Sequence, residues 1–272
     1  LEAKALAQKR GGKLYRLKFT SVDGSTEKDV LIQQILDTLE YRQIDLSTTA
    51  IIEDGSIIGA NVSIGAYSYI GANVKLNDRV VVHPHAIIDG NTNIGKDTKI
   101  FPNAVIGMEP QDLKYKGEKN FINIGSNCVI RESVTIHPGT SSANSMTSIG
   151  NNCLLMVGAH VAHDCVIGDN VILINQATLA GHASVGDHAI IGGLSGVQPF
   201  VRIGKHAYIA GMTAVEMDIL PYGIGKGILR RCFLTGVNIK GLRQRGFTKE
   251  NIQQIRELYI EIFDGPSTEI PD

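Results

Sequence analysis

The sequence predicts an all-β solenoid followed by a C-terminal helical appendage, and three observations support this fold class. Aliphatic residues recur at every sixth position in two long runs, a small or β-branched residue usually follows four positions later, and the period stops near Pro221, before a segment with helical spacing. A period of six fits neither an α-helix nor an ordinary hairpin sheet. It is typical of a hexapeptide β-helix, in which each hexad makes a short strand and a turn.

The two runs place the coils of the solenoid along the chain. The first run is Ile58, Ile64, Ile70, Leu76, Val82, Ile88, Ile94, Ile100 and Ile106. The second run is Ile149, Leu155, Val161, Ile167, Leu173, Leu179, Val185, Ile191, Val197, Ile203, Ile209 and Val215. Three hexads make one coil of 18 residues, so we expect roughly nine or ten coils.

The limits of the repeat divide the 272 residues into three predicted parts. Residues 46–221 are expected to form the β-helix domain, and residues 222–272 a C-terminal helical domain. Residues 1–45 form an N-terminal extension without a chemical motif. Within that extension, Lys13 to Thr20 is predicted to be a short strand and Thr26 to Leu39 a helix.

Two segments interrupt the repeat, at residues 108–120 and 138–147. Loops that leave a rigid, regular scaffold often carry binding residues. After the repeat, the glycine-rich segment 223–227 lacks the strand-to-helix setting of a phosphate-binding loop, so we expect a mobile connection there.

A helix is predicted after Thr248, which can cap it, with Glu250 in the first turn. Its apolar stripe would consist of Ile252, Ile255, Leu258, Tyr259, Ile262 and Phe263, and Gly265-Pro266 would end it. Such a helix is expected to cap the open edge of the solenoid, which would otherwise invite pairing with another chain.

Composition limits the classes of partner. The formal net charge of -1 gives no reason to expect nucleic acid, and no apolar run reaches the 18 or so residues of a membrane span. There is no secretory signal pattern. The four cysteines contain no CxxC pair, which predicts packed, reduced thiols in a reducing, cytoplasmic compartment.

The 18-residue coil predicts which distant residues become neighbours. His163 should lie one coil from Gly181, about 4.8 Å away along the ladder, and Asn175, Gly193 and Gly211 should form another column. Because glycine has no side chain to block approach, its N–H is open to a ligand. An imidazole base beside an open N–H donor is the minimum equipment for acyl transfer.

Other interpretations of the histidines stay open on spacing alone. His160, His163 and Asp164 lie within five residues, and His182 is about one coil away. They could be solvated turn residues, or His160 and His163 could belong to a metal site, although no third ligand has convincing spacing.

Several motifs in this order closely resemble the UDP-N-acetylglucosamine acyltransferase family, which catalyses the first step of lipid A synthesis. The resemblance covers about residues 46–264. The motifs are Gln111–Tyr115 (QDLKY), Ile130–His137 (IRESVTIH), His160–Cys165 (HVAHDC), Leu179–His182 (LAGH), Gly236–Ile239 (GVNI), Gly241-Leu242 and Arg245–Phe247 (RGF).

The resemblance implies a left-handed parallel β-helix acting as a homotrimer, with active sites between subunits. It implies transfer of an (R)-3-hydroxyacyl chain from acyl carrier protein to the 3-hydroxyl of UDP-N-acetylglucosamine, with no metal and no cofactor beyond the carrier's phosphopantetheine. His163 would be the general base, Asp164 would orient it or stabilise its charge, and the Gly181 amide would be the oxyanion donor.

The resemblance also implies a set of substrate-binding residues. Asp112, Lys114, His160 and His182 would bind the nucleotide sugar or the acyl-pantetheine arm. Asn238 and Arg245 would contact the UDP end, and Gly211 would line the acyl groove and help to set chain length. Gln198 would lie in the acceptor region.

The chain departs from the family pattern near the acceptor and nucleotide regions. Gln198-Pro199 stands where the family commonly has His-Gln, Gln244-Arg245 where it has Arg-Arg, and Lys240 where it usually has an acidic residue. Residues 228–234 and the N-terminal extension lack the family's usual counterparts. Alternatives to the O-acyltransferase are therefore an N-acyltransferase on a UDP-3-amino sugar, a catalytically silent β-helix scaffold and a zinc-dependent carbonic anhydrase.

Overall fold

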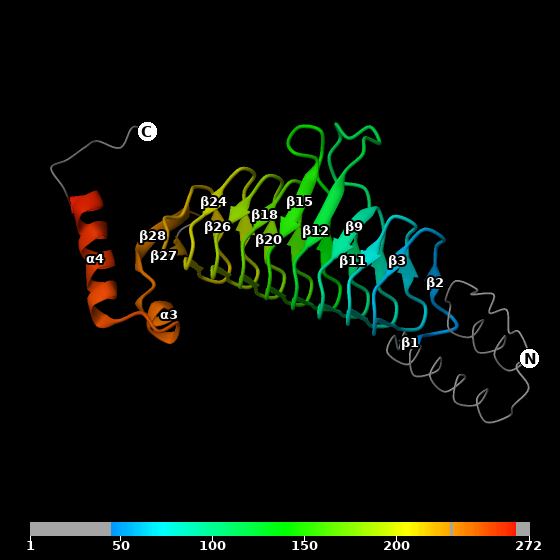
Figure 1. Cartoon of the computed structure of the whole chain (residues 1–272). Helices are drawn as coiled ribbons and strands as arrows, with labels where there is room; N and C mark the ends of the chain where they lie inside the picture. The colour runs from blue at the N-terminus through cyan, green and yellow to red at the C-terminus, as the bar shows by residue number, and fades with distance from the viewer. Residues whose placement is uncertain (1–44, 229–230, 265–272) are drawn as a thin grey trace, which may run out of the picture.

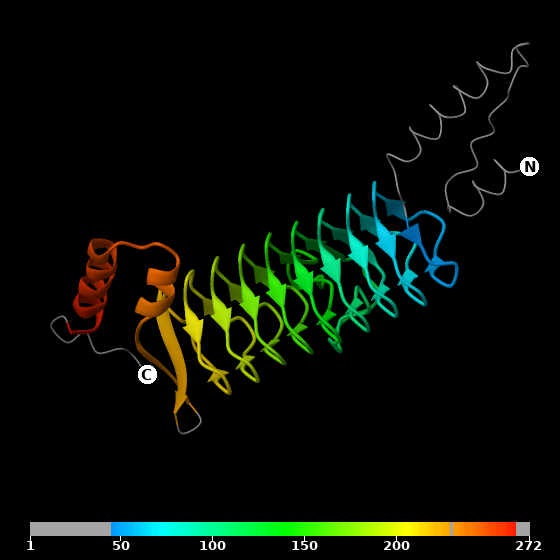
Figure 2. The ribbon, with the colours of Figure 1, turned by 90° about the horizontal axis from the view of Figure 1, so that it is seen from below.

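The computed structural model describes residues 45–228 and 231–264, which form a three-sided parallel β-helix followed by a hairpin and two helices (Figure 1). Each coil contributes one strand to each of three sheets, and coils stack along one axis (Figure 2). The predicted solenoid is confirmed. The predicted strand and helix of the N-terminal extension lie outside the described residues, as does the predicted helix end at Gly265-Pro266.

The three sheets are numbered here in the order in which the chain first enters them. Sheet 1 contains β1 (Asp45–Leu46), β4 (Ser63–Ile64), β7 (Val81–Val82), β10 (Lys99–Ile100), β13 (Val129–Ile130), β16 (Leu154–Leu155), β19 (Ile172–Leu173), β22 (Ile190–Ile191), β25 (Tyr208–Ile209), β27 (Gly223–Ile228) and β28 (Arg231–Val237). Sheet 2 contains β2 (Ile51–Ile52), β5 (Tyr69–Ile70), β8 (Ile87–Ile88), β11 (Val105–Ile106), β14 (Thr135–Ile136), β17 (His160–Val161), β20 (Thr178–Leu179), β23 (Gly196–Val197) and β26 (Ala214–Val215). Sheet 3 contains β3 (Ile57–Ile58), β6 (Lys75–Leu76), β9 (Asn91–Ile94), β12 (Phe121–Ile124), β15 (Met146–Ile149), β18 (Val166–Ile167), β21 (Ser184–Val185) and β24 (Arg202–Ile203).

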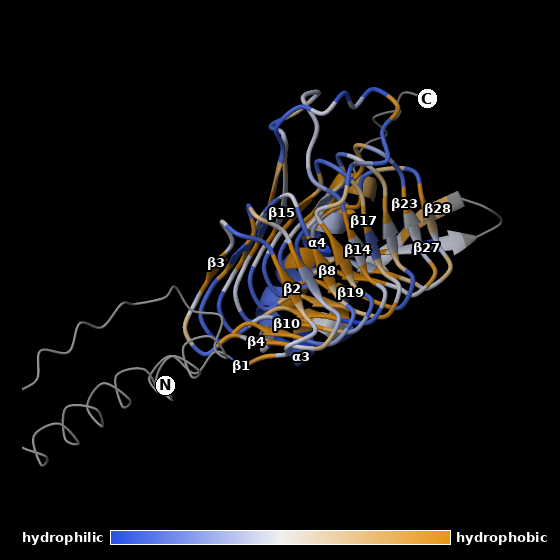
Figure 3. Cartoon of the chain, turned by 90° about the vertical axis from the view of Figure 1, so that its right-hand side faces the viewer, coloured by the Kyte–Doolittle hydropathy of each residue, from blue (hydrophilic) through white to orange (hydrophobic). Residues whose placement is uncertain are grey.

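The core of the solenoid is the column of aliphatic side chains that the hexad period predicts. Every residue of the two runs is buried except Ile58, which is half-buried in the third strand. Hydrophobic residues follow the strands, whereas the turns and the two long loops are mostly hydrophilic (Figure 3). The four cysteines are free and buried, as predicted for packed thiols.

The turns form three corners, which we name by the sheets that they connect. Corner 1–2 joins sheet 1 to sheet 2, corner 2–3 joins sheet 2 to sheet 3, and corner 3–1 leads into the next coil. Both predicted interruptions leave the prism at corner 2–3, between β11 and β12 and between β14 and β15. Strand β15 includes Met146 and Thr147, so the second loop ends two residues earlier than predicted because these residues pair with β12.

The glycine-rich segment 223–227 is not a mobile connection, and that prediction is wrong. It lies in β27, which pairs in parallel with β25 and antiparallel with β28. A side chain on Gly225 would approach the Ile209 Cδ1 to 2.8 Å and the Cys232 Sγ to 3.2 Å. Glycine is therefore required here for close packing of a strand, a tertiary cause that local composition does not reveal.

Two helices follow the hairpin. Helix α3 (Ile239–Gln244) begins at Asn238, and helix α4 (Lys249–Asp264) follows Thr248, whose hydroxyl accepts from the Asn251 N–H as predicted for a cap. The predicted apolar stripe of α4 is only partly covered, since Ile252 is buried but Leu258, Ile262 and Phe263 are exposed. The hairpin, rather than α4 alone, covers the last edge of sheet 1. None of the described helices combines the length and apolarity that crossing a membrane requires.

Candidate active site

Corner 2–3 carries a pocket of about 300 Å³ built from successive coils. The loop after β11, the loop after β14 and the turns after β17, β20 and β23 all contribute to it. The pocket is lined by Asp112, Lys114, Ser142, His163, Gly181, His182, Pro199 and Phe200. Five of the sequence-predicted site residues therefore meet in one place.

His163 faces Gly181 as the coil spacing predicts. A Cβ atom on Gly181 would lie 2.5 Å from the His163 Cε1 and 2.6 Å from the Nε2, so no side chain fits at position 181 while the ring keeps this position. Among the described residues, no acceptor is bonded to the Gly181 N–H. The two groups required for acyl transfer, a base and an open amide donor, are thus side by side.

Asp164 orients the His163 ring. The His163 Nδ1 lies 2.8 Å from the Asp164 Oδ2, and the Asp164 side chain is only 1% exposed. A carboxylate accepts hydrogen bonds, so the Nδ1 carries the proton of the neutral ring and the Nε2 presents its lone pair. The Nε2 lies on the side of the ring that faces Gly181, 2.6 Å from the position of a Cβ on that residue, so it can accept the proton of a hydroxyl bound beside the Gly181 N–H.

His182 closes one side of the pocket. Its ring stacks on Phe200 with centroids 4.4 Å apart and meets the His163 ring edge-on at 5.1 Å. The His182 Nε2 lies 3.9 Å from the Asp164 Oδ2. His182 is therefore held by aromatic packing, with its ring edge available to a bound molecule.

Asp112 and Lys114 reach the pocket from the first loop. The Lys114 N–H donates to the Asp112 Oδ1 at 2.9 Å, which fixes a tight turn at this point. Glu118 ties this loop to the second one, since its Oε1 accepts from the Ser141 N–H at 3.2 Å and the Ser141 hydroxyl at 2.9 Å. A hydrogen bond from the Lys116 N–H, followed by those from the Glu118 N–H and the Ser141 groups, lowers the pKa of Glu118 to about 2.

His160 does not line this pocket. It lies on the outer face of sheet 2 in β17, where its Nδ1 is 2.7 Å from the Thr135 hydroxyl and its ring packs edge-on against His137. Burial lowers the pKa of His160, and burial together with the charges of His160 and His163 lowers the pKa of His137 to about 4. Both rings are therefore neutral at pH 7.

Gln198 and Gly211 lie beside the pocket or away from it. Gln198 is exposed at corner 2–3, directly before the pocket residues Pro199 and Phe200, but does not itself line the pocket. Gly211 lies between β25 and β26, at corner 1–2, stacked on Gly193. The structure thus confirms the glycine column and places it on a different corner from His163.

Asn238 and Arg245 lie at corner 3–1. The Asn238 Oδ1 accepts from the Gly241 N–H at 3.1 Å, and its Nδ2 donates to the His206 carbonyl oxygen at 3.0 Å. The Arg245 Nη2 donates to the His188 carbonyl oxygen at 2.8 Å. Burial lowers the pKa of Arg245, and its Nη1 is buried without a hydrogen-bond partner within the described part of the chain.

The same corner 2–3 offers a possible metal donor set. Ligand atoms of His163, Asp164 and His182 lie within 4.8 Å of one another, and two imidazoles with a carboxylate suit Zn²⁺ in type. However, the Asp164 Oδ2 already accepts from the Thr140 hydroxyl and the His163 Nδ1. A cation would have to displace these hydrogen bonds, so the arrangement fits an orienting carboxylate better than a ligand.

Sequence reasoning missed Thr140, Ser142 and Phe200. Thr140 and Ser142 lie in the interruption at residues 138–147, where the lost hexad spacing removes the means of predicting neighbours. Phe200 could have been found, because it lies 18 residues after His182 and therefore one coil along. Its ring stacking on His182 follows from that spacing.

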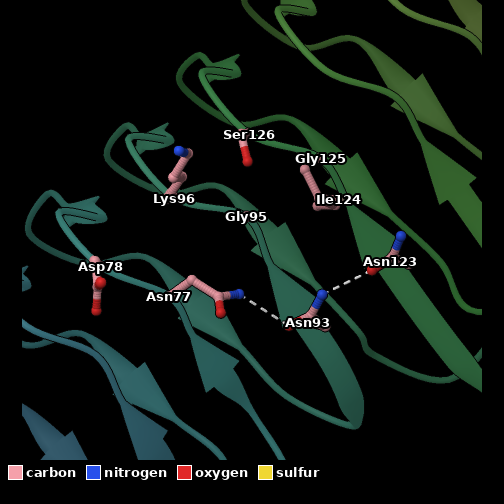
Figure 4. A pocket seen from close by; sticks show the side chains of 9 residues that line it. All are labelled: Asn77, Asp78, Asn93, Gly95, Lys96, Asn123, Ile124, Gly125 and Ser126. Carbon is pink, nitrogen blue, oxygen red and sulfur yellow. Dashed lines mark hydrogen bonds between the residues drawn. The ribbon is translucent and has the colours of Figure 1, made fainter.

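A second, larger hollow of about 400 Å³ lies where sheet 3 meets corner 3–1 (Figure 4). It is lined by a row of asparagines, in which the Asn77 Nδ2 donates to the Asn93 Oδ1 at 3.0 Å and the Asn93 Nδ2 donates to the Asn123 Oδ1 at 2.7 Å. The amides thus bond mainly to one another along the stack. This ladder stabilises the pairing of neighbouring coils and holds no base beside an open donor.

The fold and the site at corner 2–3 together define a hexapeptide-repeat acyltransferase. A family model described as bacterial transferase hexapeptide (six repeats) matches residues 50–90 and 146–181. A second, described as UDP N-acetylglucosamine O-acyltransferase domain 2, matches residues 218–269. An acyl-[acyl-carrier-protein]–UDP-N-acetylglucosamine O-acyltransferase of Azorhizobium caulinodans is 51% identical over 223 residues, covering 82% of each chain.

The chain belongs to the UDP-N-acetylglucosamine O-acyltransferase family, and its solenoid is a left-handed parallel β-helix. A Rhizobium johnstonii relative of the same name is 41% identical over 80% of both chains. The solved UDP-N-acetylglucosamine acyltransferase of Francisella novicida has a TM-score of 0.80 at 37% identity, with 82% of each chain covered. That of Campylobacter jejuni has a TM-score of 0.78 at 36% identity, covering 82% of this chain and 86% of the other.

Proposed function

We propose that the protein transfers an (R)-3-hydroxyacyl chain from acyl carrier protein to the 3-hydroxyl of UDP-N-acetylglucosamine, the first step of lipid A biosynthesis. The observation that carries this proposal is the placement of the His163 ring directly against the Gly181 backbone, with Asp164 fixing the ring from behind. Membership of the acyltransferase family supports the choice of substrates.

The reaction follows from this geometry. The His163 Nε2 removes the proton of the sugar hydroxyl while the oxygen attacks the thioester carbonyl carbon. The new C–O bond places negative charge on the carbonyl oxygen, and the Gly181 N–H donates to it. When the intermediate collapses, the C–S bond breaks and the imidazolium returns its proton to the leaving thiolate. The ester is formed and the carrier thiol is released without a metal or a bound cofactor.

The substrate-binding roles are divided among the corners. Asp112, Lys114 and His182 line the pocket and are placed to hold the sugar and the pantetheine arm, whereas Asn238 and Arg245 are proposed for the UDP end and Gly211 for the acyl chain. Corners 1–2 and 3–1 of one chain face away from corner 2–3. We propose that a neighbouring subunit supplies one of these surfaces and that the protein is a homotrimer.

The outer faces of the sheets support this assembly. In sheet 1, the first residue of most strands is apolar and points outward, as at Val81, Val129, Leu154, Ile172, Ile190 and Tyr208. In sheet 3, the corresponding positions are mostly polar, such as Lys75, Asn93, Asn123, Ser148, Ser184 and Arg202. An outward apolar face of this length on sheet 1 is what a subunit interface needs. Because the proposed acyl donor is bound to acyl carrier protein, we propose that the protein is located in the cytoplasm.

The test is a product analysis. Purified protein is incubated with hydroxyacyl carrier proteins of several chain lengths and with either UDP-N-acetylglucosamine or its 3-amino analogue, and product masses are measured. We expect an ester of UDP-N-acetylglucosamine. In the His163→Ala variant turnover should fall by about 10²- to 10⁴-fold with the assembly intact. An amide alone would identify an N-acyltransferase, and no product with any donor would remove the enzymatic proposal.

A further inference from the structure

Among the described residues, two supply hydrogen bonds to the Asp164 carboxylate, Thr140 and His163, while the His182 Nε2 stays 3.9 Å from its Oδ2. The Thr140 N–H donates to the Asp164 Oδ1 at 2.9 Å and to the Oδ2 at 3.1 Å, and the Thr140 hydroxyl donates to the Oδ2 at 2.7 Å. His163 supplies the other short contact, through its Nδ1. Thr140 is 2% exposed, so water does not replace these contacts in the folded protein.

The direction of this hydrogen-bond chain follows from its protons. The Thr140 hydroxyl has one hydrogen, which goes to the carboxylate because an ionised carboxylate only accepts. The Ser142 hydroxyl, 2.7 Å from the Thr140 Oγ1, must then be the donor in that pair. A chain therefore runs from Ser142, which lines the pocket, through Thr140 to Asp164, and His163 donates to the same carboxylate from the other side.

The second loop is built to keep Thr140 in this place. The Thr140 carbonyl oxygen accepts from the Ala143 N–H at 3.2 Å and from the Ser145 N–H at 3.1 Å, which closes the loop on itself. Directly after the loop, in β15, the Thr147 hydroxyl accepts from the Asp164 N–H at 2.9 Å. Thr140 in the loop and Thr147 after it thus form hydrogen bonds with the side chain and the backbone of Asp164, respectively.

We infer that Thr140 is a positioning residue for the reaction: it fixes the Asp164 carboxylate so that His163 keeps its proton on Nδ1 and its lone pair on Nε2. This inference rests on the proposed function, because it assigns a purpose to the base that function requires. Without the Thr140 hydroxyl, the carboxylate loses a short donor and is free to rotate, and the ring that it holds loses its fixed tautomer and orientation. The pocket residues that contact the substrates are unchanged.

The experiment compares Thr140→Val, which keeps the shape but removes the hydroxyl, with Thr140→Ser, which keeps the hydroxyl. We expect kcat to fall by about 10- to 100-fold in Thr140→Val, with both KM values within about twofold of wild type. Thr140→Ser should stay within about threefold of wild type. The matched control is Thr98→Val at corner 3–1, where an equally buried hydroxyl contacts backbone groups only: it donates to the Gly125 oxygen and accepts from the Cys128 N–H. Its kcat should not change.

Two further measurements separate positioning from a structural role. Adding Thr140→Val to Asp164→Asn should reduce kcat little further, because Thr140 acts through the carboxylate that is already lost, whereas a purely structural effect would add. Histidine nitrogen NMR of the wild-type protein should show the Nδ1-protonated tautomer for His163, and a measurement on wild type does not depend on whether a variant folds.

The outcomes are distinct from those of the proposed function. An active wild type with equal kcat in Thr140→Val overturns the positioning role and leaves the proposed function standing. An Nε2-protonated His163 in the wild type overturns it as well. A wild type that forms neither ester nor amide product removes the proposed function itself.

Discussion

At the scale of single residues, the backbone at corner 2–3 adopts a left-handed conformation that residues other than glycine rarely adopt. Asp164, His182 and Phe200 occupy equivalent places in successive coils, with φ values of 59°, 64° and 65°. The left-handed region costs roughly 1–2 kcal/mol for a residue with a Cβ. The stacked coils impose it at most turns, and at this corner it places His182 and Phe200 in the pocket lining and Asp164 behind the His163 ring.

The first prediction concerns Gly181. In Gly181→Ala, the new methyl group would overlap the His163 ring, so either the ring rotates or the backbone amide moves. We expect kcat to fall by about 100-fold or more, since both the base and the oxyanion donor are displaced. The control is Gly196→Ala, where a Cβ meets no atom within 4 Å. Normal activity in Gly181→Ala would contradict the assignment of both groups.

The second prediction concerns acid stability. His137 is buried, and its pKa is about 4 in the folded protein against 6.5 for the free side chain. Between these two pH values, His137 is protonated in the unfolded chain but not in the folded protein. The contribution of His137 to the free energy of unfolding is therefore constant above pH 6.5. It decreases as the pH falls toward 4, by on the order of 3 kcal/mol in total.

The measurement is urea unfolding of wild type and His137→Gln across this range. The stability of wild type should fall more steeply, so that the difference between the two proteins shrinks as the pH falls from 6.5 to 4. Above pH 7 the difference should be constant, which serves as the internal control. If the free energies of unfolding of the two proteins change in parallel with pH across the whole range, His137 is not the cause of the loss of stability in acid.

At the scale of elements, the site depends on two loops that leave neighbouring coils side by side (Figure 1). The hexad period predicts the strands on either side of each loop, because each strand buries one aliphatic side chain in the shared core. It says nothing of the loop conformations, which are set by hydrogen bonds such as those of Glu118 and Thr140. The sequence pattern predicts that the two loops interrupt the repeat, but it does not predict the contacts that the loops make.

The third prediction concerns the Glu118 contact between the loops. In Glu118→Gln, the charged acceptor of the Ser141 groups is lost, and the loop that carries Asp112 and Lys114 is no longer fastened. We expect KM for the nucleotide sugar to rise by about 3- to 10-fold with little change in kcat. Since the pKa of Glu118 is about 2, acidification within an ordinary assay range should not reproduce this effect.

The control for Glu118 is another half-buried carboxylate with a local partner. Glu132 pairs with Arg131 at corner 1–2, where the guanidinium donates to both of its oxygens. Glu132→Gln should leave KM for the nucleotide sugar unchanged. An equal KM in wild type and Glu118→Gln would show that the first loop holds its position without the contact.

At the scale of the whole molecule, the three corners separate the groups that the reaction needs. The base and open amide lie at corner 2–3, Gly211 at corner 1–2, and Asn238 and Arg245 at corner 3–1. A rigid prism cannot fold these corners together. The substrate roles that we propose for Gly211, Asn238 and Arg245 therefore need a second chain to bring these corners to the base, which is the physical reason for the proposed trimer.

The fourth prediction tests that assembly. Ile172 lies at an outward position of β19 in the apolar face of sheet 1. Ile172→Glu should convert the trimer to monomers and abolish activity, because a charge would be buried in the interface. Light scattering after size-exclusion chromatography measures the mass. Val166→Glu, at an exposed outward position of sheet 3, should remain trimeric; a trimeric Ile172→Glu would place the interface elsewhere.

The hexad period is sufficient to predict the coils. A six-residue period leaves one aliphatic side chain per hexad pointing inward, so the core, the strand positions and the contact between His163 and Gly181 follow from counting. The same counting places Asn175, Gly193 and Gly211 in one column. Stacking of identical turns makes sequence distance a measure of spatial distance, and this holds wherever the period is unbroken.

Contacts outside that period are known from the three-dimensional structure alone. It places Thr140 on Asp164 across 24 residues, pairs the segment 223–227 as a strand, and puts Arg245 on a corner away from the base. In each case the deciding contact joins an irregular segment to the solenoid. Such contacts depend on packing and hydrogen bonding between particular atoms, and no repeating pattern along the chain encodes them.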